Sequence, residues 1–399
     1  MIIASFQAGS KPISRPKKVT PCGFLTTIRR TMDVPMLDLK AQYQSLRDEI
    51  RQAIDGVLDS QMCILGPAVR GFEEQIDEMI PPARTLGVSN GTDALLIALM
   101  ALEVGPGDEV ILPPFTFFAT AAAVLRVGAK PVFVDIEEQT FNIDPDLIEQ
   151  AVTPATKAIM PVHLFGQCAA MTPINAVARA HSLHVVEDAA QALGAKQNGT
   201  AACALGDIAC VSFYPTKNLG AAGEAGLVAT ANPDLLERCR ILRNQGMEPR
   251  YEHHYVGGNF RMDAIQGAVL GVKGRHLAEW NAKRAEHASL YDRLLGGADV
   301  TTPSTRDGNT HVYHQYTIRS ARRDELKSFL ADRGVGSDIH YPIPLHLQPC
   351  LRDHGNGAGD FPVAERAAAE VLSLPIYPEL TPEKIEYVAD CICRFSGDA

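Results

Sequence analysis

The chain has 399 residues, in which 37 Lys and Arg stand against 47 Asp and Glu for a net charge of −10. At roughly 100–200 residues per domain, this length predicts two or three domains and a core large enough for an enzyme. The apolar content of 46 % and the charged content of 21 % exclude wholesale disorder. The acidic balance also disfavours nucleic acid as a partner, because binding it requires a basic surface.

The first 32 residues differ in charge from the rest of the chain. They contain six basic residues and no acidic one, which leaves 31 basic against 47 acidic residues, a charge of −16, for residues 33–399. We interpret residues 1–32 as a disordered tail, or as the product of a start codon upstream of Met32, and exclude them from the fold. An acidic main body must hold an anionic ligand by a local arrangement of groups.

The nine cysteines are scattered, without the paired spacing of a zinc site. This pattern predicts small core thiols in a reducing, cytoplasmic compartment. No apolar run reaches the ~20 residues of a membrane span, so we expect no membrane partner. His163, His340 and His346 lack the helical i,i+4 spacing of metal ligands, and we expect no metal.

Helical periodicity predicts two amphipathic helices before Pro81, separated by Leu65-Gly66-Pro67. Short apolar runs then alternate with helical stretches. The expected strands are Thr85–Val88, Glu109–Leu112, Pro131–Val134, Lys157–Val162, His184–Glu187, Asp207–Phe213 and Gly226–Thr230. The expected helices are Ala94–Leu102, Thr120–Val127, Pro145–Val152 and Pro173–His181. This alternation predicts a mostly parallel sheet, covered on both faces and binding ligands at the carboxyl ends of its strands.

The alternation stops at about Gly271. The later expected elements are a helix over Leu277–Leu295, a strand over His311–Arg319, a helix over Arg323–Arg333, a Pro-rich loop and a helix after Pro382. We therefore predict an α/β fold with two domains. The large domain covers residues 33–275 and the small α+β domain covers residues 276–399.

The segment SFYPTKNLG places Lys217 in a loop directly after an expected strand, with a run of small residues following it. Apolar surroundings lower the pKa of a lysine and make it a neutral nucleophile. A solvated surface lysine is the alternative, and neighbouring motifs decide between the two.

Asp188 ends the expected strand HVVED, where its carboxylate can pair with a protonated pyridine nitrogen. A Schiff-base lysine with such an aspartate is the combination found in pyridoxal phosphate (PLP) enzymes. Glu187 is the competing acid, but it points to the opposite face of the strand. We expect a structural role for it.

The sequence GVSNGTD, just before an expected helix, predicts a phosphate site. Gly91 permits a tight turn, Thr92 or Asp93 can cap the helix, and free N–H groups at its start bind an anion. Ser212 and Thr216 are candidate hydroxyl donors to the same phosphate. The motif PFTFF offers an aromatic face to a ring, with core packing as the alternative for two of its three phenylalanines.

Five motifs in order, NGTDAL, PFTFFAT, EDAAQALGA, SFYPTKNLG and GGNFRMDAIQGA, resemble those of the DegT/DnrJ/StrS family of PLP-dependent nucleotide-sugar aminotransferases. The resemblance runs from about Pro35 to Ile392. It implies the aspartate-aminotransferase-type fold, with a seven-stranded, mostly parallel sheet and a smaller domain. It also implies a homodimer with active sites built across the subunit interface.

The resemblance implies roles for individual residues. Lys217 matches the Schiff-base lysine and general base, and Asp188 the acid that keeps the ring nitrogen protonated. Gln191 matches a residue near the phenolic oxygen of the ring, and Phe117 one that stacks on the ring. The other positions match phosphate contacts (Gly91, Thr92, Ser212 and, from the other subunit, Asn259) and substrate contacts (Arg261, His340 and Tyr341).

The implied reaction moves an amino group from an amino acid, L-glutamate in the family's usual case, to a nucleotide-linked keto-sugar for amino-sugar and polysaccharide biosynthesis. A UDP-linked 3-keto-hexuronic acid fits Arg261, which can alternatively serve the nucleotide diphosphate or a salt bridge. Two other functions stay open, a sugar dehydratase of the same family and a non-catalytic regulatory or sensory relative. The dehydratases carry histidine where Lys217 stands, and a binding module needs no Schiff-base lysine, so Lys217 favours amino transfer.

Overall fold

The computed structural model describes residues 32–397, so the tail predicted for residues 1–32 lies, apart from Met32, outside the described residues. Seven strands form the central sheet in the order β1-β9-β8-β5-β4-β2-β3. Their bounds are β1 Arg84–Val88, β2 Glu109–Leu112, β3 Lys130–Phe133, β4 Thr156–Ile159, β5 His184–Asp188, β8 Ile208–Ser212 and β9 Gly226–Thr230. All neighbours from β8 to β3 are parallel, and β9 is antiparallel to both β1 and β8. The predicted mostly parallel sheet is confirmed.

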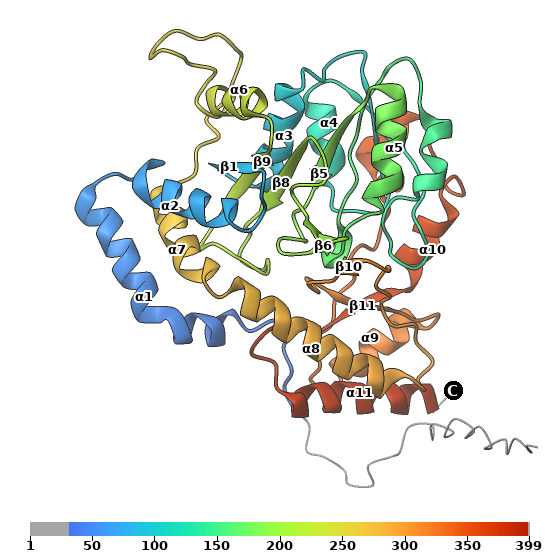
Figure 1. Cartoon of the computed structure of the whole chain (residues 1–399). Helices are drawn as coiled ribbons and strands as arrows, with labels where there is room; N and C mark the ends of the chain where they lie inside the picture. The colour runs from blue at the N-terminus through green and yellow to red at the C-terminus, as the bar shows by residue number, and fades with distance from the viewer. Residues whose placement is uncertain (1–31, 398–399) are drawn as a thin grey trace, which may run out of the picture.

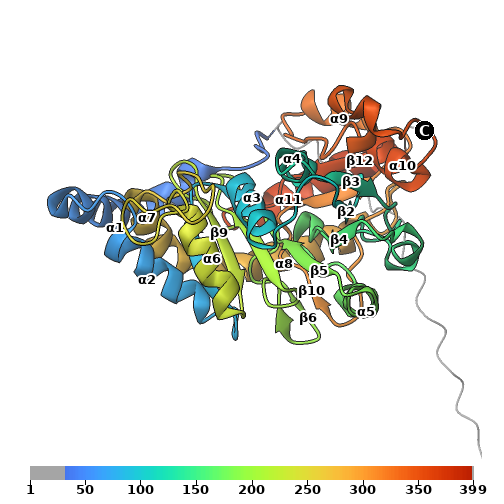
Figure 2. The same cartoon turned by 90° about the horizontal axis from the view of Figure 1, so that it is seen from above.

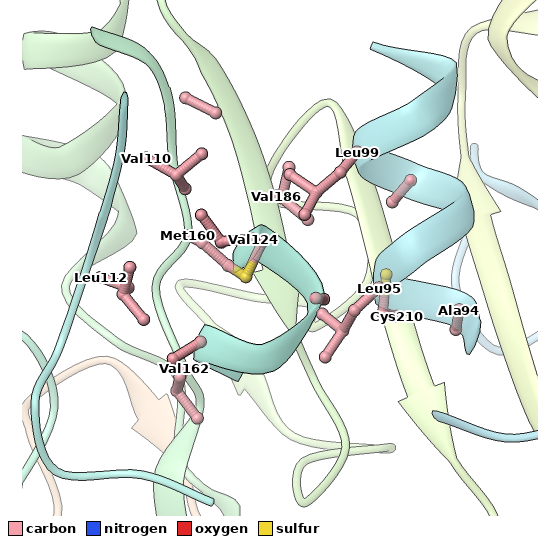
Figure 3. Close-up of a cluster of buried hydrophobic side chains, with 14 of the residues drawn as sticks. Ala94, Leu95, Leu99, Val110, Leu112, Val124, Met160, Val162, Val186 and Cys210 are labelled. Atoms are coloured by element: carbon pink, nitrogen blue, oxygen red, sulfur yellow. The ribbon is translucent and has the colours of Figure 1, made fainter. Parts of the chain in front are cut away.

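Helices cover both faces of this sheet (Figures 1 and 2). One face carries α3 (Gly91–Ala101), α4 (Ala119–Arg126) and α6 (Pro233–Arg243), and the other α1 (Leu39–Ser60), α2 (Gly66–Asp77), α5 (Met171–His181) and α7 (Ala264–Gly274). Helix α3 is apolar on almost every side because it packs between the sheet and other helices. Figure 3 shows Leu95 and Leu99 of α3 in one buried cluster with Val186 of β5 and Cys210 of β8.

A second core lies toward the C-terminus, around the antiparallel pair β11 (Tyr316–Arg319) and β12 (Val371–Leu374). Helices α9 (Arg323–Ala331) and α11 (Pro382–Gly397) pack in this core, whereas α10 (Pro362–Glu370) packs against the core on the α3 side of the central sheet. The short strands β6 (Lys196–Gln197), β7 (Thr200–Ala201) and β10 (Asn309–Thr310) form a third sheet. Helix α8 (Leu277–Leu295) connects the two main cores, with Trp280 buried in one and Tyr291 in the other. The domain boundary near residue 275 stays a prediction.

Two expected elements are wrong. The helix predicted over Pro145–Val152 is two short 3-10 turns, Pro145–Leu147 and Glu149–Ala151, and the backbone is extended again at Val152. The strand predicted over His311–Arg319 begins only at Tyr316. Before it, Tyr313 takes a left-handed φ of 44° and stacks its ring on His311 at 3.9 Å, and this side-chain contact outweighs the strand propensity of the segment.

Candidate active site

The predicted site lies at the carboxyl edge of the central sheet. Asp188 is the last residue of β5, and Ser212 is the last residue of the adjacent strand β8. The loop with Lys217 follows β8, and Phe117 lies in the loop between β2 and α4. Because parallel strands end at the same edge of a sheet, the fold gathers these four residues from distant parts of the sequence.

Asp188 is a buried carboxylate with few polar neighbours. Thr120 Oγ1 donates a hydrogen bond of 2.8 Å to one carboxylate oxygen, and the amide of Ala190 donates one of 3.2 Å to the other. Burial raises the pKa of Asp188, and these donors and the nearby Lys217 ammonium oppose that rise. A protonated ring nitrogen against Asp188 would keep it ionised. The sequence analysis did not identify Thr120, whose only signal is its place in the first turn after the PFTFF motif.

Lys217 is partly exposed at the end of a constrained loop. Its backbone N–H donates to the Tyr214 carbonyl at 2.8 Å, and a Cβ at Gly220 would lie 2.2 Å from the Pro215 carbonyl oxygen, so the loop requires glycine there. Burial lowers the pKa of Lys217 to about 8, although the charge of Asp188 acts in the opposite direction. A substantial fraction of this amine is therefore neutral near physiological pH, as a nucleophile or general base requires.

The start of α3 forms a cradle suited to an anion. Asn90 caps this helix through its side-chain oxygen, which accepts from the Asp93 amide at 2.8 Å, so the cap predicted at Thr92 or Asp93 is wrong. A Cβ at Gly91 would lie 2.6 Å from the Ser212 Cβ, and only glycine lets the helix start approach β8 so closely. The amides of Gly91 and Thr92 have no acceptor within the helix and are free for a ligand.

A loop from the C-terminal region reaches the same site. Tyr341 accepts a hydrogen bond of 3.0 Å from Gln191 Nε2, and its ring centroid lies 6.1 Å from that of Phe117. His340 Nδ1 lies 3.0 Å from the Ser373 hydroxyl. The Phe117 ring is 58 % exposed whereas Phe115 is fully buried, so Phe117 can offer a face to a ligand and Phe115 packs in the core.

Asn259 and Arg261 lie on a segment beside the residues that lead into the α3 cradle, since the Ser89 amide donates to the Phe260 carbonyl at 3.0 Å. They pair with Asn244 and Val88 in isolated bridges beside the end of β1. The Asn259 side chain is exposed, and Arg261 donates from Nη1 to the Asn244 side-chain oxygen at 2.8 Å. Arg261 Nε is buried without a hydrogen-bond partner among the described residues. Among the described residues, neither Asn259 nor Arg261 forms a hydrogen bond or ion pair with Lys217 or Asp188.

Comparison with known proteins shows the family to which the chain belongs. Residues 44–393 match the model of the DegT/DnrJ/EryC1/StrS aminotransferase family. The chain belongs to this family. A protein of Geobacillus stearothermophilus named pleiotropic regulatory protein is 51 % identical over 91 % of this chain and 99 % of its own. The UDP-N-acetyl-3-dehydro-alpha-D-glucosamine 3-aminotransferase of Acidithiobacillus ferrooxidans is 46 % identical over 90 % of this chain and 97 % of its own.

Solved structures of similar proteins agree with the fold. The structure of DesV from S. venezuelae has a TM-score of 0.89 with 44 % identity, over 91 % of this chain and 98 % of that one. Other structures similar to this chain hold pyridoxamine phosphate or are in a PLP form. As a member of the family, the protein is a PLP-dependent aminotransferase. Its seven-stranded, mostly parallel sheet with helices on both faces is the one expected of the aspartate-aminotransferase type.

The residues of the site fit this cofactor. The α3 cradle suits its phosphate, buried Asp188 suits its ring nitrogen, and the pKa of about 8 suits Lys217 to bond its aldehyde. When bound, PLP supplies a ring that accepts the electrons released at the amino-acid Cα. Among residues 32–397 no group of three or more His, Cys, Asp or Glu is placed to hold a metal ion. No helix in that range is long and apolar enough to cross a membrane.

Proposed function

We propose that this aminotransferase moves an amino group from L-glutamate to a nucleotide-linked keto-sugar in the cytoplasm. The observation that carries the proposal is Lys217, with its lowered pKa, beside buried Asp188 at the carboxyl edge of the sheet. The Acidithiobacillus relative is named for action on a UDP-linked 3-dehydro sugar, which favours a 3-keto substrate here. The regulatory name of the Geobacillus relative keeps a regulatory role as the second candidate, although such a role needs no reactive lysine.

In this proposal each side chain has one task. Lys217 takes the proton from the Cα of the donor and later returns a proton to the product carbon, while Asp188 holds the ring nitrogen protonated. Gly91, Thr92 and Ser212 bind the phosphate. Two further residues contact the ring, Phe117 by packing on its face and Gln191 near its phenolic oxygen. His340 and Tyr341 contact the sugar, and Arg261 contacts a substrate carboxylate or the diphosphate.

The proposal includes a homodimer in which Asn259 completes the phosphate site of the partner. Met62 and Ile64 are exposed, and the segment that carries them pairs with residues 262–264. The residues just before 262 include Asn259 and Val256, whose side chain is 93 % exposed. These exposed apolar side chains on adjoining segments favour a covered surface. Arg261 Nε is buried without a hydrogen-bond acceptor among the described residues, which also favours a second subunit that supplies one here.

The decisive experiment removes the reactive amine. Lys217→Ala is expected to abolish the visible absorbance of lysine-bound cofactor. It is also expected to abolish turnover of L-glutamate with UDP- or dTDP-linked 3-keto and 4-keto sugars, which is measured by detecting the aminated product by mass. Lys283→Ala, which removes a lysine paired with Glu279 on the exposed side of α8, should change neither. Full turnover by Lys217→Ala would refute the proposal. A preference for acidic sugars that survives Arg261→Ala would refute the carboxylate contact.

A further inference from the structure

A buried histidine–glutamate pair lies directly behind Asp188. His163 and Glu187 are both fully buried, and His163 Nε2 lies 2.8 Å from Glu187 Oε2. Neither side chain has a task in the reaction proposed above. We infer that His163 and Glu187 are positioning residues that fix the Asp188 carboxylate at the sheet edge, an inference that rests on the role proposed for Asp188.

Glu187 is anchored by hydrogen bonds on the far side of the strand. Successive side chains alternate between the faces of a strand, so Glu187 points away from Asp188. Its two oxygens accept four hydrogen bonds of 2.7–2.9 Å, from the ring of His163 and from the amides of Cys203, Leu205 and Gly206. Four donors fill the acceptor capacity of a carboxylate. The Glu187 side chain therefore holds the end of β5 from one side.

His163 holds the same strand end from a second side. Its Nδ1 accepts from the Ala169 amide at 3.1 Å, so the ring proton is on Nε2 and is donated to Glu187. The backbone N–H of His163 donates to the Asp188 carbonyl at 3.0 Å, and the Asp188 N–H donates to the Pro161 carbonyl at 2.9 Å. His163 thus contacts both the side chain before Asp188 and the backbone of Asp188 itself.

This arrangement matters because the role of Asp188 depends on the exact position of its carboxylate. Its carboxylate must meet a ring N–H at hydrogen-bond length, and a misplacement of about 1 Å can cost about 100-fold in rate. Thr120 and Ala190 contact the carboxylate itself, whereas His163 and Glu187 help to hold the strand end that carries it. Without the donor on His163, Glu187 keeps three of its four hydrogen bonds, and the end of β5 is held less firmly.

The test compares two replacements of His163 with a matched control. His163→Asn keeps an acceptor for Ala169 but loses the donor to Glu187, whereas His163→Gln places an amide donor where Nε2 was. His346→Asn is the control, because His346 is also buried and its Nε2 lies 3.1 Å from Glu365. Two quantities are measured, the Kd for PLP of the cofactor-free protein and the exchange of the L-glutamate α-proton in D2O by the holoenzyme.

His163→Asn is expected to raise the Kd and slow the exchange, each by about tenfold or more. His163→Gln should recover most of both losses, and His346→Asn should show neither. If His163→Asn does not fold, Glu187→Gln takes its place with the same expectation, because its amide N–H groups would face the amide donors of the 203–206 turn.

A double variant separates positioning from general destabilisation. In an Asp188→Asn background, His163→Asn should add no further loss in exchange, because the carboxylate through which it acts is already gone. Full additivity, an equal loss in His346→Asn, or wild-type exchange in His163→Asn would each overturn the inference. Wild-type exchange in Asp188→Asn alone would instead refute the role proposed for Asp188, on which the inference rests.

Discussion

At the residue scale, the lowered pKa of Lys217 has a consequence for stability. The folded protein releases this proton near pH 8, whereas an unperturbed lysine does so near pH 10.5. Between these values the unfolded chain binds more protons, so stability rises with pH there, and below pH 8 the folded state bears the full cost of the buried charge. Lys217→Met removes that cost.

We therefore expect cofactor-free Lys217→Met to be more stable than the cofactor-free wild type at pH 7, by about 1–3 kcal/mol. The difference should shrink as the pH approaches 10.5, and urea unfolding at several pH values measures it. Lys273, whose pKa burial also lowers to about 8, is present in both proteins and cancels in the comparison. A difference that is absent at pH 7, or that grows with pH, would contradict this account.

At the element scale, β1 is an edge strand whose outer side is covered by side chains. Glu73 of α2 accepts from the Gly87 amide at 2.6 Å, and Arg243 of α6 donates to the Gly87 carbonyl at 2.9 Å and to Glu73 at 3.1 Å. The pair satisfies the backbone N–H and C=O of Gly87, which an edge strand would otherwise leave open. Burial raises the pKa of Glu73, which Arg243 counteracts.

Arg243→Met should destabilise the protein by about 3–5 kcal/mol at pH 7, because it leaves a buried carboxylate without its cation. Because the folded-state pKa of Glu73 is raised, the folded protein takes up a proton there more readily than the unfolded chain, and this contribution to stability disappears as the pH rises. The destabilisation caused by Arg243→Met should therefore be smaller at pH 5 than at pH 8. Arg240→Met on the same helix is the control, since its partners Glu237 and Glu248 are about half exposed. The free energy of unfolding of Arg240→Met should fall by about 1 kcal/mol or less. Equal losses in the two variants would argue against this function of the pair.

The elements also show what the sequence could and could not predict. Strands β2 and β9 lie where their apolar runs predicted, because turn residues bound each run. Periodicity carries no strand direction, so the antiparallel β9 could not be foreseen. Lys217 and Asp188 were predictable as candidates because Asp188 ends a strand and Lys217 lies in the loop that follows one. Thr120 was not, because its hydrogen bond to Asp188 joins residues 68 positions apart, and such a contact exists only in the folded chain.

At the scale of the whole molecule, the position of Asn259 distinguishes a shared active site from a self-contained one. Asn259 is exposed beside β1 and forms no hydrogen bond with Lys217 or Asp188 of its own chain. If it serves the partner, a dimer of one Lys217→Ala chain and one Asn259→Ala chain has one site with both residues intact and one with neither. If it serves its own chain, both sites of that dimer are damaged.

We expect subunit exchange between inactive Lys217→Ala and impaired Asn259→Ala proteins to restore activity. Random pairing makes half of the dimers mixed, each with one intact site, so the restored activity should be about a quarter of wild type. Lys217→Ala mixed with Asp188→Asn is the matched control, because these two residues face each other within one chain and no mixed dimer contains an intact site. If the activity of the first mixture does not exceed that of its two components, either Asn259 acts within its own subunit or no dimer forms. Sedimentation of the mixture distinguishes these two explanations.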